Sequence, residues 1–494
     1  MCSVQDGDVP MKRPEKDACL GRLCMKCKEV QAVLVTRVND AFCKDCFQVY
    51  VTHKFRAAIG KTKLVRDGEH VLVAYSGGPS SSALLCLIQE GLSQRAHKKL
   101  RFRPGVLFID EGATIGLTGE ERLAICEKIH SIMKNTGFTC YIKSLEEGFT
   151  LTPDNEEKTS DSSTTVNPCN GSSPAFRDGE SIETEEVQWK YEINQDLERR
   201  LKETLNNMKS VSAKEDFIRS LRNMILLDVA RNCGYSKVML GSCGTQLAVR
   251  LLTDISTGRG AHAAMVAAFA DRRHDDVMFL RPMRDFSSKE AAIYNSFHNV
   301  ESVFIPSLTT KAQTGVSIEH LTESFVTGLQ ADYPSTVSNI MRTGEKLDSS
   351  VEKKADKYCT MCKVRYHILP SALIAKYFDV FALLYRGPLD TKSVGASSAL
   401  SAVEFSQKIS CGSVNKGDNS AKTGLKFWRR GWGLSSKILN RDEVKSNLCY
   451  GCRLIVRDME DVNKLPEYVL KDVAWRNRRS NMKKEIEGFL LEDV

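Results

Sequence analysis

The sequence predicts an α/β protein built on a parallel sheet, with a cysteine-rich module toward each end of the chain. Three observations predict this class. Short apolar runs of strand length alternate with stretches of helical periodicity, a serine- and glycine-rich segment follows one of these runs, and four C-x-x-C pairs flank them. The 494 residues exceed what one hydrophobic core usually organises, so we expect two or three domains.

The predicted domain boundaries follow the cysteine pairs and the local composition. We expect an amino-terminal zinc ribbon at 1–60, an α/β domain at 61–340 and a carboxy-terminal zinc domain at 341–494. The stretch 151–187 is acidic and lacks periodic apolar residues, which predicts a disordered insertion within the α/β domain. A segment rich in Ser, Gly and Lys at 387–424 predicts a mobile loop, and the chain ends in a basic tail.

The overall composition narrows the class of protein. Apolar residues at 42% and charged residues at 27% exclude a fibrous or mostly disordered chain. The sequence has neither a membrane-spanning apolar run nor an amino-terminal signal peptide, so we expect a cytoplasmic, reducing location. There, 17 cysteines are more typical of metal ligands than of disulfides. The net charge of +8 combines −7 in 151–187 with +15 elsewhere, so the charge available to a polyanionic partner is nearly twice the overall figure.

The first cysteine quartet has the spacing of a zinc ribbon. Fifteen residues separate Cys24/Cys27 from Cys43/Cys46, within the range of four-cysteine zinc sites. Chance would place roughly 0.6 C-x-x-C pairs in a chain of this composition. The intervening residues 30–39 alternate like a hairpin strand. Four thiolates around one ion predict a closed structural site, with redox pairs or chance spacing as the alternatives.

A second quartet lies in the carboxy-terminal part of the chain. It consists of Cys359/Cys362 and Cys449/Cys452, separated by 86 residues. Because the entropy of closing a loop grows only logarithmically with its length, a long insertion inside a metal site is tolerated. We therefore expect a second structural zinc ion, and the alternative is two unrelated pairs.

The strongest signal for chemistry follows a predicted buried strand at His70–Tyr75. Next come the loop Ser76–Ser82 and a helix over Ala83–Gln89. Glycines let backbone N–H groups approach an anion, serines add hydroxyl donors, and the helix start supplies a positive dipole. The pattern predicts a phosphate or pyrophosphate cradle, and a serine-rich helix cap is the alternative.

The remaining elements extend the α/β pattern. We expect further strands at 105–110, 139–142 and 237–241, and helices at 120–134, 216–233 and 245–252. Such an alternation places ligands at the carboxyl ends of the parallel strands.

These residues resemble a known family. The strand Val71–Ala74, the loop Ser76-Gly77-Gly78-Pro79-Ser80-Ser81 and the strand Val238–Gly241 resemble the PP-loop ATP pyrophosphatases, whose sheet is adenine nucleotide alpha hydrolase-like. Together with both quartets and both insertions, they make the chain similar to the cytoplasmic tRNA 2-thiolation protein 2 family. The resemblance implies a PP-loop ATPase-like α/β domain.

The sequence departs from the active members of this superfamily in three places. Ser80 stands where the active loop has Asp, which puts ATP binding in doubt. Residues 242–247 replace a His-Asn-x-x-Asp-Asp type of segment. The stretches 214–219 and 303–306 lack the cysteines with which active thiolases handle sulfur or an iron–sulfur cluster. We therefore assign no catalytic residue. The vestigial nucleotide-binding loop consists of Ser76, Gly77, Gly78, Ser80 and Ser81.

The resemblance implies a non-catalytic subunit required for 2-thiolation of the wobble uridine in cytoplasmic tRNAs for Lys, Glu and Gln. Its partner would be the active PP-loop thiolase, cytoplasmic tRNA 2-thiolation protein 1. The sulfur would come from a thiocarboxylated ubiquitin-related modifier. Two alternatives stay open: an ATP-dependent 2-thiouridine synthase that uses Cys233 or Cys243 as nucleophile, and a zinc-dependent nucleic-acid-binding adaptor.

Basic residues are the candidates for contact with tRNA phosphates. The candidates are Arg259, Arg281, Arg284, Trp428, Arg429 and Arg430, together with the tail residues Arg476, Arg478, Arg479, Lys483 and Lys484. The run 427–432 mixes Trp and Arg as stacking sites often do, although exposed Trp and Arg are also enriched at protein interfaces. A solvated surface is the alternative for each of these residues.

Overall fold

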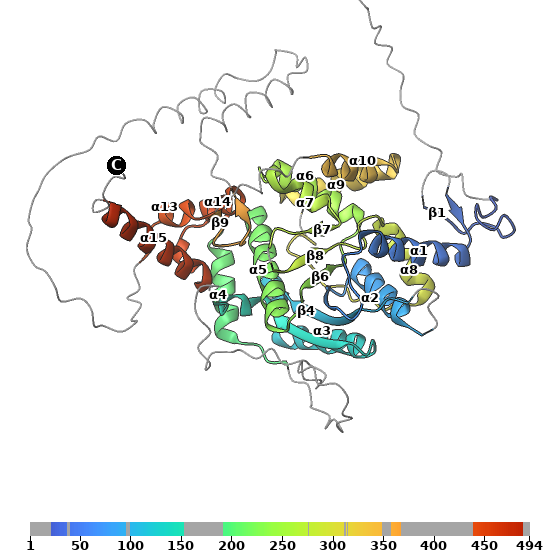
Figure 1. Ribbon diagram of the computed structural model, residues 1–494, viewed down its shortest axis with the longest axis horizontal. Coiled ribbons are helices and arrows are strands. Elements are labelled where there is room, and N and C mark those ends of the chain that lie inside the picture. Colours follow the sequence, from blue (N-terminus) through green and yellow to red (C-terminus); the bar gives the residue numbers. More distant parts are fainter. Residues whose placement is uncertain are drawn as a thin grey trace, which may run out of the picture. The chain divides into compact units, whose positions relative to one another are not determined.

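The structure is a computed structural model of the chain (Figure 1). It describes residues 21–36, 40–94, 99–152, 191–274, 276–310, 313, 315–347, 357–366 and 438–487. From these ranges, 21–366 and 439–487 belong to one compact unit. The expected insertion, from 153 onward, and the expected loop at 387–424 lie outside the described residues.

A six-stranded sheet forms the centre of this unit (Figure 1). Its strand order is β5-β4-β3-β6-β8-β7, and every neighbouring pair is parallel except β7 with β8. The strands are β3 His70–Tyr75, β4 Arg103–Asp110, β5 Thr139–Ser144, β6 Lys237–Leu240, β7 Ala270–Asp271 and β8 Met278–Leu280. The predicted parallel α/β sheet is confirmed, with an antiparallel strand added at one edge.

Helices cover both faces of the sheet. The helices that precede or connect the strands are α1 Lys44–Thr62, α2 Pro79–Leu92, α3 Gly119–Lys134, α4 Gln195–Asn206, α5 Val211–Asn232, α6 Gly244–Ser256 and α7 Ala263–Ala267. Those that follow are α8 Ser288–His298, α9 Ile318–Asp332, α10 Thr336–Glu345, α13 Arg441–Ser446, α14 Tyr450–Asp458 and α15 Glu467–Glu487. No helix in the described ranges is long and apolar enough to span a bilayer.

Alternating side chains of β3 divide the core into two layers. Val71 and Val73 pack with residues of α1, α2, α3 and α8, whereas Leu72 packs with residues of α4, α5 and the carboxy-terminal helices. Successive side chains of a strand point to opposite faces, so a strand that is apolar throughout must be covered on both. This explains why the run at 70–75 has no polar alternation.

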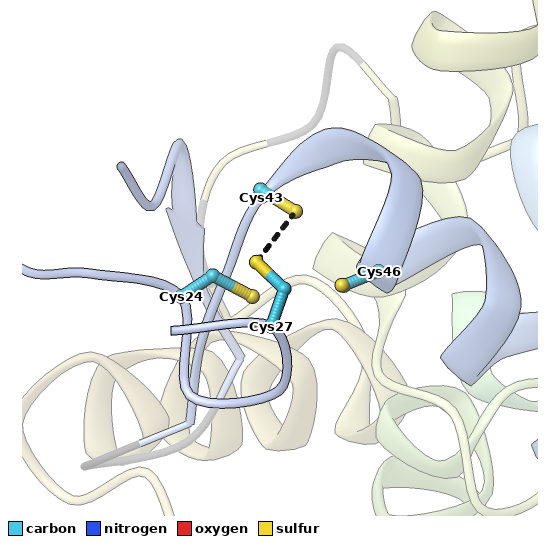
Figure 2. A group of neighbouring side chains, drawn as sticks. All are labelled: Cys24, Cys27, Cys43 and Cys46. Atoms are coloured by element: carbon cyan, nitrogen blue, oxygen red, sulfur yellow. Dashed lines mark hydrogen bonds between the residues drawn. The ribbon is translucent and has the colours of Figure 1, made fainter. Parts of the chain in front are cut away.

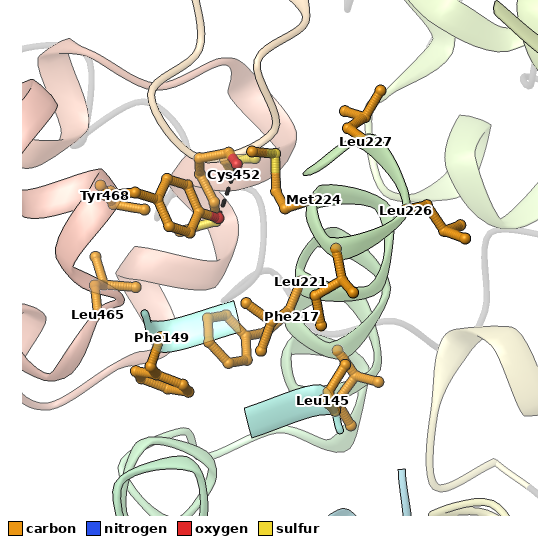
Figure 3. Packing of buried hydrophobic residues seen from close by; sticks show 14 of the residues in the cluster. Leu145, Phe149, Phe217, Leu221, Met224, Leu226, Leu227, Cys452, Leu465 and Tyr468 are labelled. Atoms are coloured by element: carbon orange, nitrogen blue, oxygen red, sulfur yellow. Dashed lines mark hydrogen bonds between the residues drawn. The ribbon is translucent and has the colours of Figure 1, made fainter. Parts of the chain in front are cut away.

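The carboxy-terminal helices share the second of these layers. Figure 3 shows Phe217 and Met224 on α5 directed toward the side of Leu465 and Tyr468. Phe217 and Tyr468 are each 1% exposed, so this part of the layer excludes water as fully as the core beside the sheet. The second cysteine quartet is therefore carried on elements that are packed against the α/β sheet.

A buried ionic cluster lies at the carboxyl ends of β4 and β5. Arg122 is fully buried, and its guanidinium contacts Asp110 at 2.7 Å, Glu146 at 2.6 Å and Glu198 at 3.2 Å. Tyr191 donates a hydrogen bond of 2.8 Å to the same Asp110. One cation thus pairs with carboxyl groups from β4, the turn after β5, and α4, which ties these elements together.

We expect Arg122→Ala to lower the free energy of unfolding by about 3–5 kcal/mol, because it leaves buried carboxylates without a counter-charge. The exposed pair Arg101–Asp67 provides the control, and Arg101→Ala should cost less than about 1 kcal/mol. Urea unfolding followed by circular dichroism measures both changes. Equal small losses for the two variants would contradict the role given to Arg122.

Candidate metal centres and the serine-lined loop

The four cysteines of the first quartet converge on one point (Figure 2). Cys24 and Cys27 lie on a turn, Cys43 immediately precedes α1, and Cys46 lies in the first turn of that helix. Their four sulfur atoms lie within 4.8 Å of one another, and the Cys27 and Cys43 sulfurs are 4.0 Å apart. The expected hairpin is present as a short antiparallel pair, β1 Leu34–Val35 with β2 Ala41–Phe42.

The surroundings of this quartet shift the pKa values of two of its thiols in opposite directions. Burial raises the pKa of Cys24, but N–H groups of Cys27, Cys43 and Lys26 outweigh it and lower the pKa to about 6. Burial and the neighbouring thiols raise the pKa of Cys46 to about 12. Four thiolates at this spacing repel one another, and a divalent cation between them removes that repulsion.

The second quartet has the same form. Cys359 and Cys362 lie on the turn between β9 Lys357–Tyr358 and β10 Arg365–Tyr366. Cys449 immediately precedes α14, and Cys452 lies in its first turn. All four sulfurs lie within 4.8 Å of one another, with 3.7 Å between those of Cys362 and Cys449. The 86-residue separation in sequence has not separated the two pairs in space.

The two quartets also share their backbone hydrogen bonds. In each, the first cysteine's carbonyl accepts from the residue after the C-x-x-C, at 2.8 Å from Lys28 and 2.9 Å from Lys363. Both lysines have a positive φ, 61° and 54°, which is uncommon for a residue other than glycine. In each quartet, the backbone N–H of the residue after the first cysteine also donates a hydrogen bond. The acceptor is the carbonyl of the residue two positions before the third cysteine. The sequence shows one sign of this shared backbone pattern, because a lysine directly follows the second cysteine of the first pair in both quartets.

These distances fit a single tetrahedral ion. Four Zn–S bonds of about 2.3 Å place the sulfurs roughly 3.8 Å apart, close to the 4.0 and 3.7 Å found here. A four-iron cluster is larger than one ion and requires more widely separated ligands. Both donor sets are therefore suited to zinc, with no ligand position left open.

Helix α15 fastens the second quartet to the rest of the protein. Asp472, 1% exposed at its side chain, pairs with Lys363 at 2.8 Å and with Arg476 at 2.8 Å. Tyr468 donates to the carbonyl of Met361, between the two cysteines of the first pair, at 3.1 Å (Figure 3). A change in the metal turn is therefore transmitted to α15.

The serine-lined loop lies between β3 and α2, at the switch point where the sheet order reverses. The helix begins at Pro79, four residues earlier than the sequence predicts, so Ser80, Ser81 and Ser82 belong to its first turn. Proline is favoured at this position because it has no N–H to satisfy, but it also removes a donor from the anion cradle.

Hydrogen bonds inside the loop use its hydroxyl groups. Ser81 Oγ donates to the Gly78 carbonyl at 2.9 Å and lies 3.1 Å from Ser76 Oγ. Ser82 Oγ donates to the Gly77 carbonyl at 3.3 Å. These hydroxyls stabilise the βα turn through its carbonyls, but no serine side chain caps the helix, whose N-cap residue is Gly78.

Two other segments close in on the loop. Val303 N–H donates to the Gly77 carbonyl at 2.8 Å, and a Cβ at Gly77 would lie 3.3 Å from the Val303 carbonyl oxygen. A Cβ at Gly241, just after β6, would lie 2.7 Å from Ser81 Cα. Glycine is required there because the end of β6 touches the loop backbone. The ends of β3 and β6 therefore meet at this loop.

The two candidate nucleophiles lie at different ends of the sheet. Cys243 follows β6, is fully buried, and has its sulfur 3.1 Å from Ser288 Oγ. Cys233 comes before β6, at the opposite edge from the loop. Burial raises the pKa of the Cys233 thiol, which disfavours the thiolate.

The predicted tRNA-binding arginines are engaged with carboxylates. Arg259 pairs with Asp216 at 2.7 Å, Arg281 is 5% exposed and pairs with Asp271 at 2.9 Å, and Arg284 pairs with Glu345. Trp428, Arg429 and Arg430 lie outside the described residues. Contact of any of these residues with tRNA stays a prediction. Sequence reasoning did not foresee the acidic partners, because they come from distant segments.

The sheet and these sites define a doubly wound α/β protein with two four-thiol centres and a serine-lined loop at its switch point. Known proteins extend this description. The sequence model of the family described as Cytoplasmic tRNA 2-thiolation protein 2 matches residues 317–454, which include the second quartet. The chain belongs to the cytoplasmic tRNA 2-thiolation protein 2 family.

Full-length relatives establish this membership. The chain is 40% identical to Cytoplasmic tRNA 2-thiolation protein 2-B of Xenopus laevis, over 100% of this chain and 99% of the relative. It is 33% identical to Cytoplasmic tRNA 2-thiolation protein 2 of Homo sapiens, over 98% of this chain and 95% of the relative. Among solved structures, it is similar to a U34-tRNA thiolase of Methanococcus maripaludis that contains a 4Fe-4S cluster. That similarity has a TM-score of 0.46 and 14% identity, over 76% of this chain and 100% of the other.

Removing one thiolate from either quartet should remove one tightly held ion. We expect elemental analysis to find about two zinc ions per chain after dialysis against EDTA, and about one in Cys27→Ser or Cys362→Ser. Cys126→Ala, which removes a buried cysteine outside both quartets, is the control and should retain two. Full zinc content in both quartet variants would contradict the assignment.

Proposed function

We propose that this chain is a non-catalytic subunit required for 2-thiolation of the wobble uridine in cytoplasmic tRNAs for Lys, Glu and Gln. It acts in the cytoplasm as the heterodimer partner of the active PP-loop thiolase, cytoplasmic tRNA 2-thiolation protein 1. The sulfur comes from a thiocarboxylated ubiquitin-related modifier. Family membership supports the pathway, and the state of the loop supports the silent role.

The hydroxyl groups of the loop hydrogen-bond within the loop itself, and this observation is the main support for the proposal. Ser76, Ser81 and Ser82 hydrogen-bond within the βα turn. Position 80 supplies a buried hydroxyl rather than a carboxylate, and Pro79 supplies no N–H. Adenylation requires Mg²⁺ to be held against the nucleotide phosphates, and a carboxylate is the usual ligand for it. The loop keeps the shape of a phosphate cradle and lacks its chemistry.

The cysteines support the same role. A sulfur-transferring thiol must be ionised and reachable by substrate. Cys243, the candidate beside the loop, is enclosed, and its sulfur contacts Ser288. The eight quartet cysteines fit two closed zinc sites, which stabilise structure and leave no position for a substrate. The chain therefore contributes a stable scaffold, and its partner contributes the reactive group that handles the sulfur from the modifier.

Purified alone, the chain should release no more pyrophosphate from ATP in the presence of tRNA than a protein-free control. Adding the active thiolase should produce pyrophosphate release. The double variant Ser76→Ala, Ser81→Ala in this chain should leave the release rate of the pair within about twofold of the rate with the wild-type chain. A coupled pyrophosphate assay measures all three. Robust release by this chain alone, lost in the double variant, would establish the alternative of an active synthase.

Helix α15 carries the cations that we propose for tRNA contact. Its amino-terminal half is anchored by Tyr468 and Asp472, whereas its other half is exposed. The exposed cations are Arg478, Arg479, Lys483 and Lys484. Arg479 also lies over the ring of Trp475, 5.4 Å from its centroid, and Trp475 is 45% exposed. Cations beside an exposed aromatic ring suit a nucleic acid that offers both phosphates and bases.

Replacing these four cations with Gln should weaken tRNA binding by the full chain and flatten its salt dependence. If all four contact phosphates, the slope of log affinity against log salt should fall by roughly 3. The control variant changes four exposed cations elsewhere, Lys128, Arg199, Lys202 and Lys209. Filter binding at several salt concentrations measures the slopes, and equal slopes for the two variants would contradict the assignment.

A further inference from the structure

A third group of metal-binding side chains lies where α2 packs against α8. Ligand atoms of Cys86, Glu90 and His298 lie within 4.8 Å of one another. Cys86 and Glu90 are four residues apart on α2, so they share one face of that helix. His298 comes from the last turn of α8, more than 200 residues later. These residues belong to neither quartet and lie outside the serine-lined loop.

Tyr294 holds this group in place. It is fully buried, and its hydroxyl lies 2.9 Å from Glu90 Oε2 and 3.6 Å from Cys86 Sγ. Its ring lies against that of His298, with 4.2 Å between centroids. A side chain that contacts all three candidate ligands and cannot itself move into solvent is typical of the residues that orient metal ligands from behind.

The spacing of the ligand atoms is close to that of a tetrahedral site. His298 Nδ1 lies 3.1 Å from Glu90 Oε1, and Cys86 Sγ lies 4.0 Å from the same oxygen. Zinc bonds of 2.0 to 2.3 Å at tetrahedral angles separate such ligands by roughly 3.3 to 3.6 Å. Shifts of a few tenths of an ångström, within the reach of rotating side chains, would complete the geometry.

The donor set selects the kind of ion. One thiolate, one imidazole and one carboxylate suit zinc and the neighbouring late transition metals, whereas magnesium and calcium prefer oxygen ligands alone. The Glu90 side chain is 35% exposed and that of His298 is 21% exposed, so an ion can reach the group from solvent. His298 Nε2 is enclosed and has no hydrogen-bond partner in the part of the chain that the structure describes. Nδ1, which faces Glu90, is therefore the ligand atom, and the enclosed Nε2 takes no part in the site.

We propose that Cys86, Glu90 and His298 form a third metal site, which takes a zinc-type divalent ion with water in the fourth position. The site fastens the end of α2 to the end of α8. It differs from the two quartets in having three protein ligands and access to solvent. The competing arrangement is a metal-free network in which Glu90 accepts hydrogen bonds from Tyr294 and His298.

The position of α8 gives this site a structural consequence. Phe297, next to His298, packs edge-on against Phe47 of α1 with 5.9 Å between ring centroids. At the other end of α8, Glu290 pairs with Lys54 of α1 at 2.9 Å. Helix α8 thus joins the helix of the first quartet to the helix of the serine-lined loop. An ion bound at its last turn stabilises that junction.

The test is a Co²⁺ titration of the full chain after dialysis against EDTA, which removes an open-site ion and leaves the closed quartets loaded. The wild-type chain should take up about one equivalent with the visible absorption of a cysteine-ligated ion, and its Tm should rise. Glu90→Gln and His298→Asn should each weaken that uptake at least tenfold, and Cys86→Ser should abolish the thiolate absorption.

His320→Asn is the matched control. His320 is also part-buried and has one enclosed ring nitrogen without a hydrogen-bond partner in the described ranges, but it belongs to no group of ligands there. Its variant should bind Co²⁺ like the wild type. Glu90→Gln preserves the size of the side chain, so it decides the question if His298→Asn fails to fold. No uptake by the wild-type chain, or equal uptake by wild type and Glu90→Gln, would overturn the proposal in favour of the metal-free network.

Discussion

The parallel pairing of β3 with both β4 and β6 is the constraint on which the other features depend. Leu72 pairs with Gly105 on one side and with Val238 on the other. Because the chain runs outward from β3 in both directions, the loops after β3 and β6 must meet at one edge of the sheet. That meeting sets Gly241 against Ser81 and positions the serine-lined loop. It also exposes both faces of β3 to helices, which produces the two core layers.

This arrangement allows the fold to remain stable whether or not the loop performs chemistry. In the loop, Ser81 and Ser82 donate hydrogen bonds to carbonyls of the turn that links strand to helix, so they contribute to stability whether or not a nucleotide binds. The Val303 hydrogen bond to Gly77 adds a further internal contact. A chain that lost the catalytic carboxylate and cysteines would still benefit from these serines. Each cysteine quartet is likewise attached to a sheet face, through α1 and α8 or through α14, α15 and α5.

Sequence reasoning recovered the elements that depend on local patterns. The strands at 70–75, 105–110 and 237–241 are predictable because both faces of each are covered and most of their side chains are apolar. The two quartets were predictable because the spacing of each C-x-x-C fixes a local turn. The start of α2 differs from the prediction because its proline occupies the first position of the helix and not the loop.

The features that escaped prediction all depend on contacts between distant segments. The burial of Arg281 follows from its pairing with Asp271 and from its hydrogen bonds to the carbonyls of Met265 and Ala268, none of which periodicity reveals. The approach of Cys86 to His298 depends on the packing of α2 on α8. The same holds for part of the backbone pattern that the two quartets share, because one hydrogen bond in each links the first cysteine pair to the segment before the third cysteine.

The proposed role requires this chain for wobble-uridine thiolation and assigns the chemistry to its partner. The direct measurement is mass spectrometry of tRNA nucleosides from cells that lack the chain and carry either the wild type or a Cys233→Ala, Cys243→Ala variant. We expect 2-thiouridine to be lost without the chain and to be restored equally by both. Unchanged 2-thiouridine without the chain would contradict the requirement. Failure of a stably expressed double variant to restore it would show that this subunit supplies the reactive sulfur itself.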